Sequence, residues 1–130
     1  MSMFKKLFAK ENQPQEPATV IPWKELLNLE QLDQIEEVSK TKTVIIFKHS
    51  TRCGISSMVL RLFKKGYRYQ DNQIEPYFLD LIANRSLSNE VAIRFQTIHQ
   101  SPQLLVIKNG QTVHAASHYD IQVDELERFI

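Results

Sequence analysis

The sequence predicts an α/β domain with a four-stranded mixed β-sheet flanked by helices and an extra helix on its N-terminal side. The chain has 130 residues, 42% of them hydrophobic, which suffices for one domain with a buried core. From residue 43 onward, segments with strand and helix patterns alternate. The last two strand patterns are separated by an Asn-Gly dipeptide, the strongest short signal of a β-hairpin. These observations define the fold class.

The first 19 residues are predicted to be a tail and a linker that precede a domain over residues 20–130. Residues 1–10 could place Phe4, Leu7 and Phe8 on one face of a short helix, but they lack the apolar run of a secretory signal. A helix this short is marginal in isolation, so we interpret it as a frayed tail. Residues 11–19 contain two prolines and no large apolar side chain, which is typical of a linker.

The first elements of the domain are the extra helix, a strand and a second helix. The extra helix is expected over residues 28–39, because Asn28 can cap it and Gln31 can reach back to the cap. A nearly continuous β-branched and aromatic run over residues 43–47 predicts a central strand covered on both faces. A second helix over about residues 53–65 follows directly, and two lysines and a glycine mark its end.

The second half of the domain repeats the alternation. A second strand is expected over residues 74–81 with its start marked by Pro76, and Ser86 can cap a third helix. The hairpin strands are expected over residues 103–107 and 111–115, and an amphipathic helix over residues 123–130 ends the chain. The first two strands would be parallel, and the hairpin would add an antiparallel edge. Periodicity alone does not separate the small α/β folds that share this order.

Composition excludes several classes of function. The chain has 16 Lys and Arg against 15 Asp and Glu, so no broad basic surface directs it to nucleic acid or to an anionic membrane. No segment approaches the roughly 20 apolar residues that a membrane-spanning helix requires. One cysteine cannot form an intramolecular disulfide or a Cys-rich zinc site, and the spacing of the four histidines matches no metal signature. The lack of paired cysteines favours a reducing compartment, so we expect a cytoplasmic protein.

Cys53 is the candidate nucleophile, because it stands where the predicted central strand meets the second helix. The first N–H groups of a helix lack intrahelical acceptors, and the helix dipole adds partial positive charge, so both favour a thiolate there. Lys48, Arg52 and a protonated His49 could add to this effect. Ser56 stands where a Cys-x-x-Cys motif has its second cysteine, and its hydroxyl can donate to the thiolate but cannot form a disulfide. The predicted chemistry uses one thiol.

Three classes of function remain open on these residues alone. A monothiol oxidoreductase is favoured by the position of Cys53 and by the Ser-Pro dipeptide that opens the third strand. A binding module with a passive Cys53 would instead have an ordinary thiol pKa, near about 8.5. A redox sensor would have Cys53 modified under oxidative stress without turnover. A monothiol glutaredoxin-like protein that uses another small thiol is a close variant of the first class.

The chain resembles the thioredoxin-like monothiol bacilliredoxins over about residues 20–130. The motifs that carry the resemblance occur in the same order along the domain: Phe47-Lys48-His49-Ser50-Thr51-Arg52-Cys53-Gly54-Ile55-Ser56, Ser88-Asn89-Glu90, His99-Gln100-Ser101-Pro102-Gln103, Ile107-Lys108-Asn109-Gly110 and His114-Ala115-Ala116-Ser117-His118. The family commonly has proline where this chain has Gly54.

The resemblance implies a thioredoxin fold and a thiol-disulfide oxidoreductase that removes bacillithiol, a low-molecular-weight thiol, from client proteins. Cys53 would attack the mixed disulfide, release the client and keep the bacillithiol until another thiol resolves it. Bacillithiol would be a co-substrate, and no permanently bound cofactor or metal is expected. The implied site further comprises residues of the active-site loop and a cis-proline dipeptide that packs against the sulfur: Thr51, Arg52, Gly54, Ser56, Ser101 and Pro102.

Overall fold

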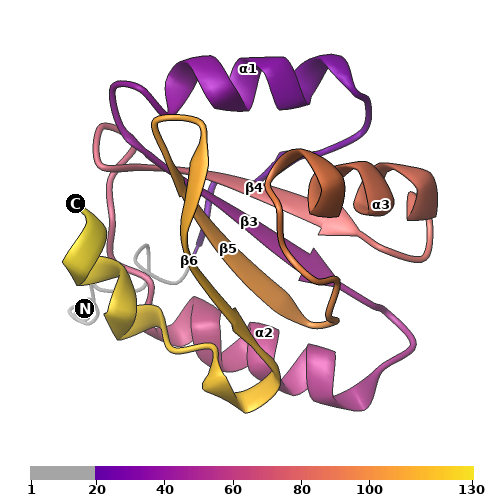
Figure 1. Ribbon diagram of the computed structural model, residues 1–130. Helices are drawn as coiled ribbons and strands as arrows, with labels where there is room; N and C mark the ends of the chain where they lie inside the picture. Colours follow the sequence, from indigo (N-terminus) through magenta and orange to yellow (C-terminus); the bar gives the residue numbers. More distant parts are fainter. Residues whose placement is uncertain (1–19) are drawn as a thin grey trace, which may run out of the picture.

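The computed structural model describes residues 20–130, so the predicted tail and linker over residues 1–19 lie outside the described residues. The described chain forms one sheet with helices on both faces (Figure 1). Its elements, in chain order, are β2 (Lys24–Glu25), α1 (Glu30–Val38), β3 (Thr43–His49), α2 (Gly54–Gly66), β4 (Ile74–Asp80), α3 (Arg85–Arg94), β5 (Gln103–Lys108), β6 (Gln111–Ser117) and two 3₁₀ segments, η2 (His118–Asp120) and η3 (Val123–Phe129).

The sheet has the strand order β2-β4-β3-β5-β6. Strands β3 and β4 are parallel, whereas β5 pairs antiparallel with both β3 and β6, so the predicted mixed sheet is confirmed. The predicted count of four strands is one too low, because β2 adds in parallel to the outer edge of β4. A strand of two residues is too short to produce a periodic pattern, which is why the sequence did not predict it.

Several predicted element boundaries differ from the structure. Strand β4 begins two residues before Pro76, which is tolerated because β2 pairs only with the next two residues, Tyr77 and Phe78. Ser86 lies inside the first turn of α3, where Asn84 occupies the N-cap position, so the predicted Ser86 cap is wrong. The last segment is a 3₁₀ helix rather than an α-helix. Short terminal segments are shaped by what they pack against more than by their own periodicity.

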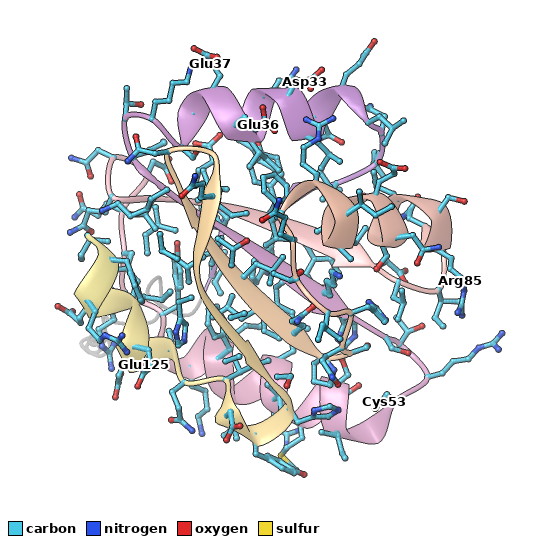
Figure 2. All side chains as sticks on the ribbon, viewed as in Figure 1. Asp33, Glu36, Glu37, Cys53, Arg85 and Glu125 are labelled. Carbon is cyan, nitrogen blue, oxygen red and sulfur yellow. The ribbon has the colours of Figure 1, made fainter. Side chains whose placement is uncertain are left out.

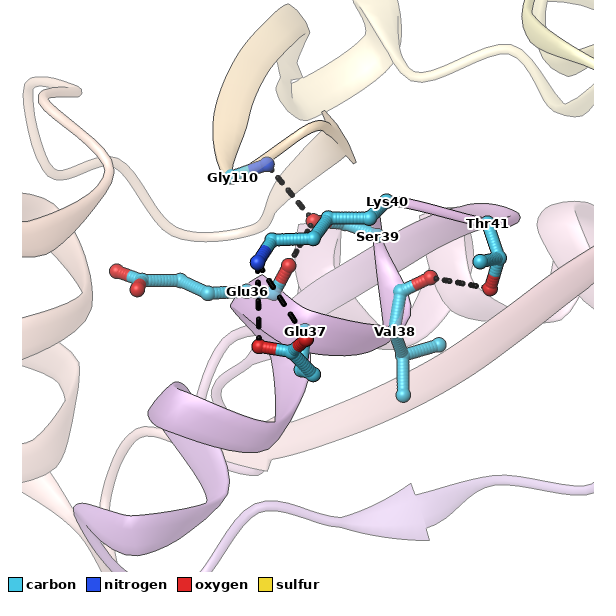
Figure 3. A network of polar contacts seen from close by, with 7 residues as sticks. All are labelled: Glu36, Glu37, Val38, Ser39, Lys40, Thr41 and Gly110. Carbon is cyan, nitrogen blue, oxygen red and sulfur yellow. Dashed lines mark hydrogen bonds and ion pairs between the residues drawn. The ribbon is translucent and has the colours of Figure 1, made fainter.

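The helix α1 begins after Leu29, one residue later than the predicted Asn28 cap, but the predicted reciprocal hydrogen bonds between Asn28 and Gln31 are present. The backbone N–H of Gln31 donates to Asn28 Oδ1 at 3.1 Å, and the backbone N–H of Asn28 donates to Gln31 Oε1 at 3.1 Å. The end of α1 is tied to the β5–β6 hairpin, as Figure 3 shows: Ser39 Oγ donates to the carbonyl of Glu36 and accepts from the N–H of Gly110, each at 2.8 Å. Gly110 has φ +75°, as the tight Asn-Gly turn requires.

Each face of the sheet buries its own hydrophobic cluster. Helices α1 and α3 cover one face, and α2 with η2 and η3 covers the other (Figure 1). Central strand β3 is buried along its whole length and alternates between the two clusters, with Val44 and Ile46 in the first and Ile45 and Phe47 in the second. This alternation decides on which side of the sheet the next residues of β3, Lys48 and His49, lie.

Candidate active site

Cys53 is the N-cap residue of α2 and is partly exposed. Figure 2 shows it at the end of α2 that follows the loop from β3. Its backbone has φ −109° and ψ 119°, and the first helical hydrogen bond runs from the N–H of Ser57 to the carbonyl of Cys53 at 3.1 Å. The N–H groups of the three residues between them therefore have no intrahelical acceptor. The sulfur is attached where a helix presents free donors.

The loop around Cys53 offers unobstructed space on its solvent side. Thr51, Arg52 and Gly54 are exposed. A Cβ atom built at Gly54 would have no heavy atom within 4 Å, so no close contact demands a glycine there. The N–H of Cys53 donates to the carbonyl of Ser50 at 3.2 Å, which closes the turn that leads into α2. Cys53 is therefore a partly exposed residue between exposed neighbours on this loop.

Ser56 is fully buried beneath the loop, and its hydroxyl is hydrogen-bonded there. It accepts from the backbone N–H of Ser50 at 3.1 Å and lies 2.8 Å from Nδ1 of His49. The sequence suggested a hydrogen bond from Ser56 to the Cys53 thiolate, but within residues 20–130 the hydroxyl bonds to His49 and Ser50. Ser56 thus contacts the loop that carries Cys53.

His49 lies on the α2 side of the sheet, where it is 7% exposed. Its ring centroid is 5.5 Å from that of Phe78. Burial lowers the pKa of His49 below its ordinary value, Asp80 opposes that shift and Lys64 adds to it. The imidazole is therefore neutral at pH 7.

Lys48 lies on the opposite side of the sheet from His49 and is fully buried. Its Nζ is 3.3 Å from Nδ1 of His99, a ring that also lies near Ser88 of α3. Burial lowers the pKa of Lys48 from 10.5 to about 8. The structure therefore separates Lys48 from the loop residues with which the sequence grouped it. Strand alternation was the available signal, but the continuous apolar run before Lys48 obscured which face it would take.

Ser101 and Pro102 form the loop that precedes β5. The peptide bond between them is cis, as the resemblance implies. Gln103, the next residue, pairs with Lys48 across β5 and β3, so the Ser101–Pro102 bond lies beside the end of β3 from which the Cys53 loop departs. The carbonyl of Pro102 accepts from the N–H of His118 at 3.0 Å. The hydroxyl of Ser101 is buried and has no hydrogen-bond partner among residues 20–130.

The described part of the chain has neither a cluster of metal ligands nor a membrane-spanning helix. Residues 20–130 contain no group of three or more His, Cys, Asp or Glu side chains arranged to hold a metal ion. In that range, no helix has the length and apolar character needed to cross a membrane.

Replacing Lys48 with methionine is expected to raise the free energy of unfolding at pH 7 by about 1–3 kcal/mol, because methionine removes a buried charge that faces no carboxylate in residues 20–130. The folded-state pKa of about 8 lies below the ordinary 10.5. Between these values the unfolded chain holds a proton that the folded chain lacks, so wild-type stability rises with pH. The advantage of methionine should therefore shrink across this window.

Urea unfolding of both proteins at pH 7 and at about pH 9.5 measures this change. Lys40→Met is the matched control, because the Lys40 side chain is 60% exposed and its substitution should add no such pH dependence. A stability difference between Lys48→Met and wild type that is the same at both pH values would contradict the prediction.

Comparisons with known proteins agree with this geometry. The family model described as "Monothiol bacilliredoxin BrxC" matches residues 24–126. Among solved structures, the chain is 32% identical to a protein with a thioredoxin fold, with a TM-score of 0.68, over 80% of this chain and 89% of the other. Family and fold together support a role in thiol redox chemistry.

More distant solved structures share the fold. Thioredoxin from Malassezia sympodialis is 20% identical, with a TM-score of 0.62, over 84% of this chain and 90% of its own. Thioredoxin from Schistosoma mansoni is 24% identical, with a TM-score of 0.60, over 82% and 96%. The predicted thioredoxin fold is confirmed, and the chain belongs to the monothiol bacilliredoxin BrxC family.

Proposed function

We propose that this protein is a monothiol thiol-disulfide oxidoreductase that removes bacillithiol from client proteins through Cys53. The observation that carries the proposal is the setting of Cys53: it is a partly exposed helix N-cap, its loop leaves β3 where the cis-proline loop enters β5, and the chain is of the bacilliredoxin family. Residue 56, where a dithiol motif has its second cysteine, is a buried serine that cannot form a disulfide. Exchange through one sulfur fits this arrangement.

The proposed reaction is a pair of thiol-disulfide exchanges. The Cys53 thiolate attacks the bacillithiol sulfur of the mixed disulfide, the bond to the client sulfur breaks, and the electron pair leaves with the client as a thiolate, which takes a proton from water to become the free thiol. A second low-molecular-weight thiol, as its thiolate, then attacks the bacillithiol sulfur on Cys53. The two small thiols leave as a disulfide, and Cys53 regains its thiolate. Each step conserves electrons, and no bound cofactor takes part.

The remaining predicted site residues have supporting roles in this proposal. The exposed loop residues border the sulfur on the solvent side, and we assign to Thr51, Arg52 and Gly54 the contacts with the incoming mixed disulfide. We assign to Ser101 and Pro102 the contact with the small thiol, because their loop lies beside the end of β3. A chain with one cysteine suits a reducing compartment, and we propose the cytoplasm.

Intact-protein mass spectrometry tests the proposal. The reduced protein is mixed with a client carrying a bacillithiol mixed disulfide, and a glutathione-capped client is run in parallel. We expect Cys53 to gain the mass of bacillithiol, the client to appear as a free thiol, and glutathione transfer to be slow. Preferred transfer of glutathione would support the glutaredoxin-like alternative instead.

Two other outcomes would overturn the proposal. A Cys53 adduct that further bacillithiol does not release would indicate a redox sensor without turnover. An unreacted protein with either client would indicate a binding module on a redox scaffold.

A further inference from the structure

The buried contact between His49 and Ser56 has no place in the exchange steps of the proposed function, on which this inference rests. Both residues are polar and nearly inaccessible, with Ser56 at 0% and His49 at 7% exposure. Buried polar groups are stabilising only when they are hydrogen-bonded, and here each satisfies the other. The pair lies directly under the loop that carries Cys53.

The Ser56 hydroxyl contacts both Ser50 and His49. The backbone N–H of Ser50 can only donate, so Ser56 Oγ is its acceptor at 3.1 Å. In the second contact, with His49 Nδ1 at 2.8 Å, Ser56 donates or accepts according to the tautomer of the imidazole, because a hydroxyl has one proton and two lone pairs. Either tautomer of the neutral imidazole therefore keeps the two side chains linked.

This chain of hydrogen bonds reaches the backbone of Cys53. Ser50 donates its N–H to Ser56, and its carbonyl accepts the N–H of Cys53 at 3.2 Å. The imidazole of His49 is therefore linked to the residue that bears the sulfur through Ser56 and Ser50. None of these links involves the sulfur atom.

We propose that His49 is a positioning residue that holds the Cys53 loop through Ser56, and that protonation of the imidazole releases the loop. A protonated imidazole places a full charge on a side chain that is 7% exposed, and burying a charge costs far more than burying a neutral polar group. Movement of the charged ring toward water takes it away from Ser56, which weakens the contact of Ser56 with Ser50 and loosens the turn before α2. Transfer of the small thiol then slows, because the sulfur is no longer held in one orientation.

The groups that face His49 set the pH at which this release occurs. Asp80 of β4 raises the pKa of His49 and Lys64 of α2 lowers it, while the Phe78 ring and the Ser56 hydroxyl carry no charge. Burial dominates and keeps that pKa below 6.5. The loop is therefore held at neutral pH and released below the pH at which an unburied imidazole titrates.

Two substitutions at His49 separate the hydrogen bond from the packing of the ring. His49→Phe keeps a ring against Phe78 but removes the acceptor, whereas His49→Asn places an amide oxygen near the position of Nδ1 and can still accept from Ser56. Ser56→Ala removes the link from the other side with little change in volume. His114→Asn is the matched control, because His114 lies on β6 against Glu125 and Phe129.

Amide hydrogen exchange at Ser50 in the reduced protein without client is the first readout. We expect exchange about tenfold faster in His49→Phe and Ser56→Ala at pH 7, and near wild-type exchange in His49→Asn and His114→Asn. In the wild type, protection of this amide should fall as pH drops through the pKa of His49. In His49→Phe, this pH-dependent step should be missing once intrinsic exchange is subtracted.

The rate of thiol transfer at pH 7 is the second readout, with His49→Phe and Ser56→Ala expected to be slowed about tenfold and His49→Asn partly restored. Unchanged Ser50 protection and unchanged rates in both His49→Phe and Ser56→Ala would overturn the inference. The amide measurement uses no client. A wild type that transfers no bacillithiol would therefore refute the proposed function, while the exchange rates at Ser50 would still test the role of His49. If His49→Phe does not fold, the Ser50 exchange rate and the transfer rate of Ser56→Ala alone test the inference.

Discussion

Replacing Cys53 with serine is expected to abolish thiol transfer and leave the fold intact. A serine hydroxyl does not form the disulfide through which both exchange steps pass, so no adduct can accumulate on residue 53. Stability should be retained, because the side chain is partly exposed at the N-cap of α2 and serine is a preferred N-cap residue. Intact mass after incubation with the bacillithiol-capped client measures transfer, and thermal unfolding measures stability.

Ser57→Ala is the matched control for this variant. Ser57 is an exposed residue in the first turn of α2, four residues from the sulfur, and its substitution should leave transfer at the wild-type level. Unfolding of the Cys53→Ser protein would show that the sulfur is a packing element, and residual transfer would show that another group is the nucleophile. Either result contradicts the role assigned to Cys53.

Replacing Phe47 with alanine is expected to produce the largest loss of stability, about 3–5 kcal/mol in the free energy of unfolding. Phe47 is fully buried in the central strand, two residues before His49. Its ring centroid lies 6.0 Å from that of Trp23, 5.3 Å from that of Phe63 and 6.4 Å from that of Phe78. Alanine would leave a cavity where β3, β4 and α2 meet, and the packed strand and helix around it cannot fully collapse.

Urea unfolding gives the size of this loss. Val113→Ala on edge strand β6 is the control, because Val113 is 45% exposed and its truncation should change the free energy of unfolding by no more than about 0.5 kcal/mol. A loss below about 1 kcal/mol for Phe47→Ala would show that the aromatic cluster contributes little to stability.

Long, regular patterns made most of the fold predictable from the sequence. The apolar run of β3, the Asn28–Gln31 hydrogen bonds at the start of α1 and the Asn-Gly turn each encode local geometry within a few residues, and the structure contains all three. Strand β2 exists because it pairs with β4, and Pro76 is tolerated inside β4 because β2 pairs only with the two residues after it. Such information lies in the tertiary arrangement and leaves no local signal.

The candidate site likewise has one part that the sequence predicts and another that depends on the tertiary structure. The place of Cys53 at the start of a helix follows from one strand pattern and one helix pattern, so it was predictable. The hydrogen-bond partner of Ser56 was not predictable, because the hydroxyl can rotate toward the sulfur or toward His49. The fold determines which of the two lies within hydrogen-bond distance. The contact between Lys48 and His99 joins residues 51 positions apart, for which one sequence carries no spacing signal.

The open space at Gly54 makes the residue next to the nucleophile adjustable by a single codon change. The position is the first helical residue of α2, where proline is well tolerated, and Cys53 already has the extended backbone that a following proline requires. Larger or stiffer side chains can therefore be placed beside the sulfur without repacking the interior. Descendants of this chain can change which disulfides reach Cys53 with little loss of stability, and a saturation library at residue 54 would sample the same variation in the laboratory.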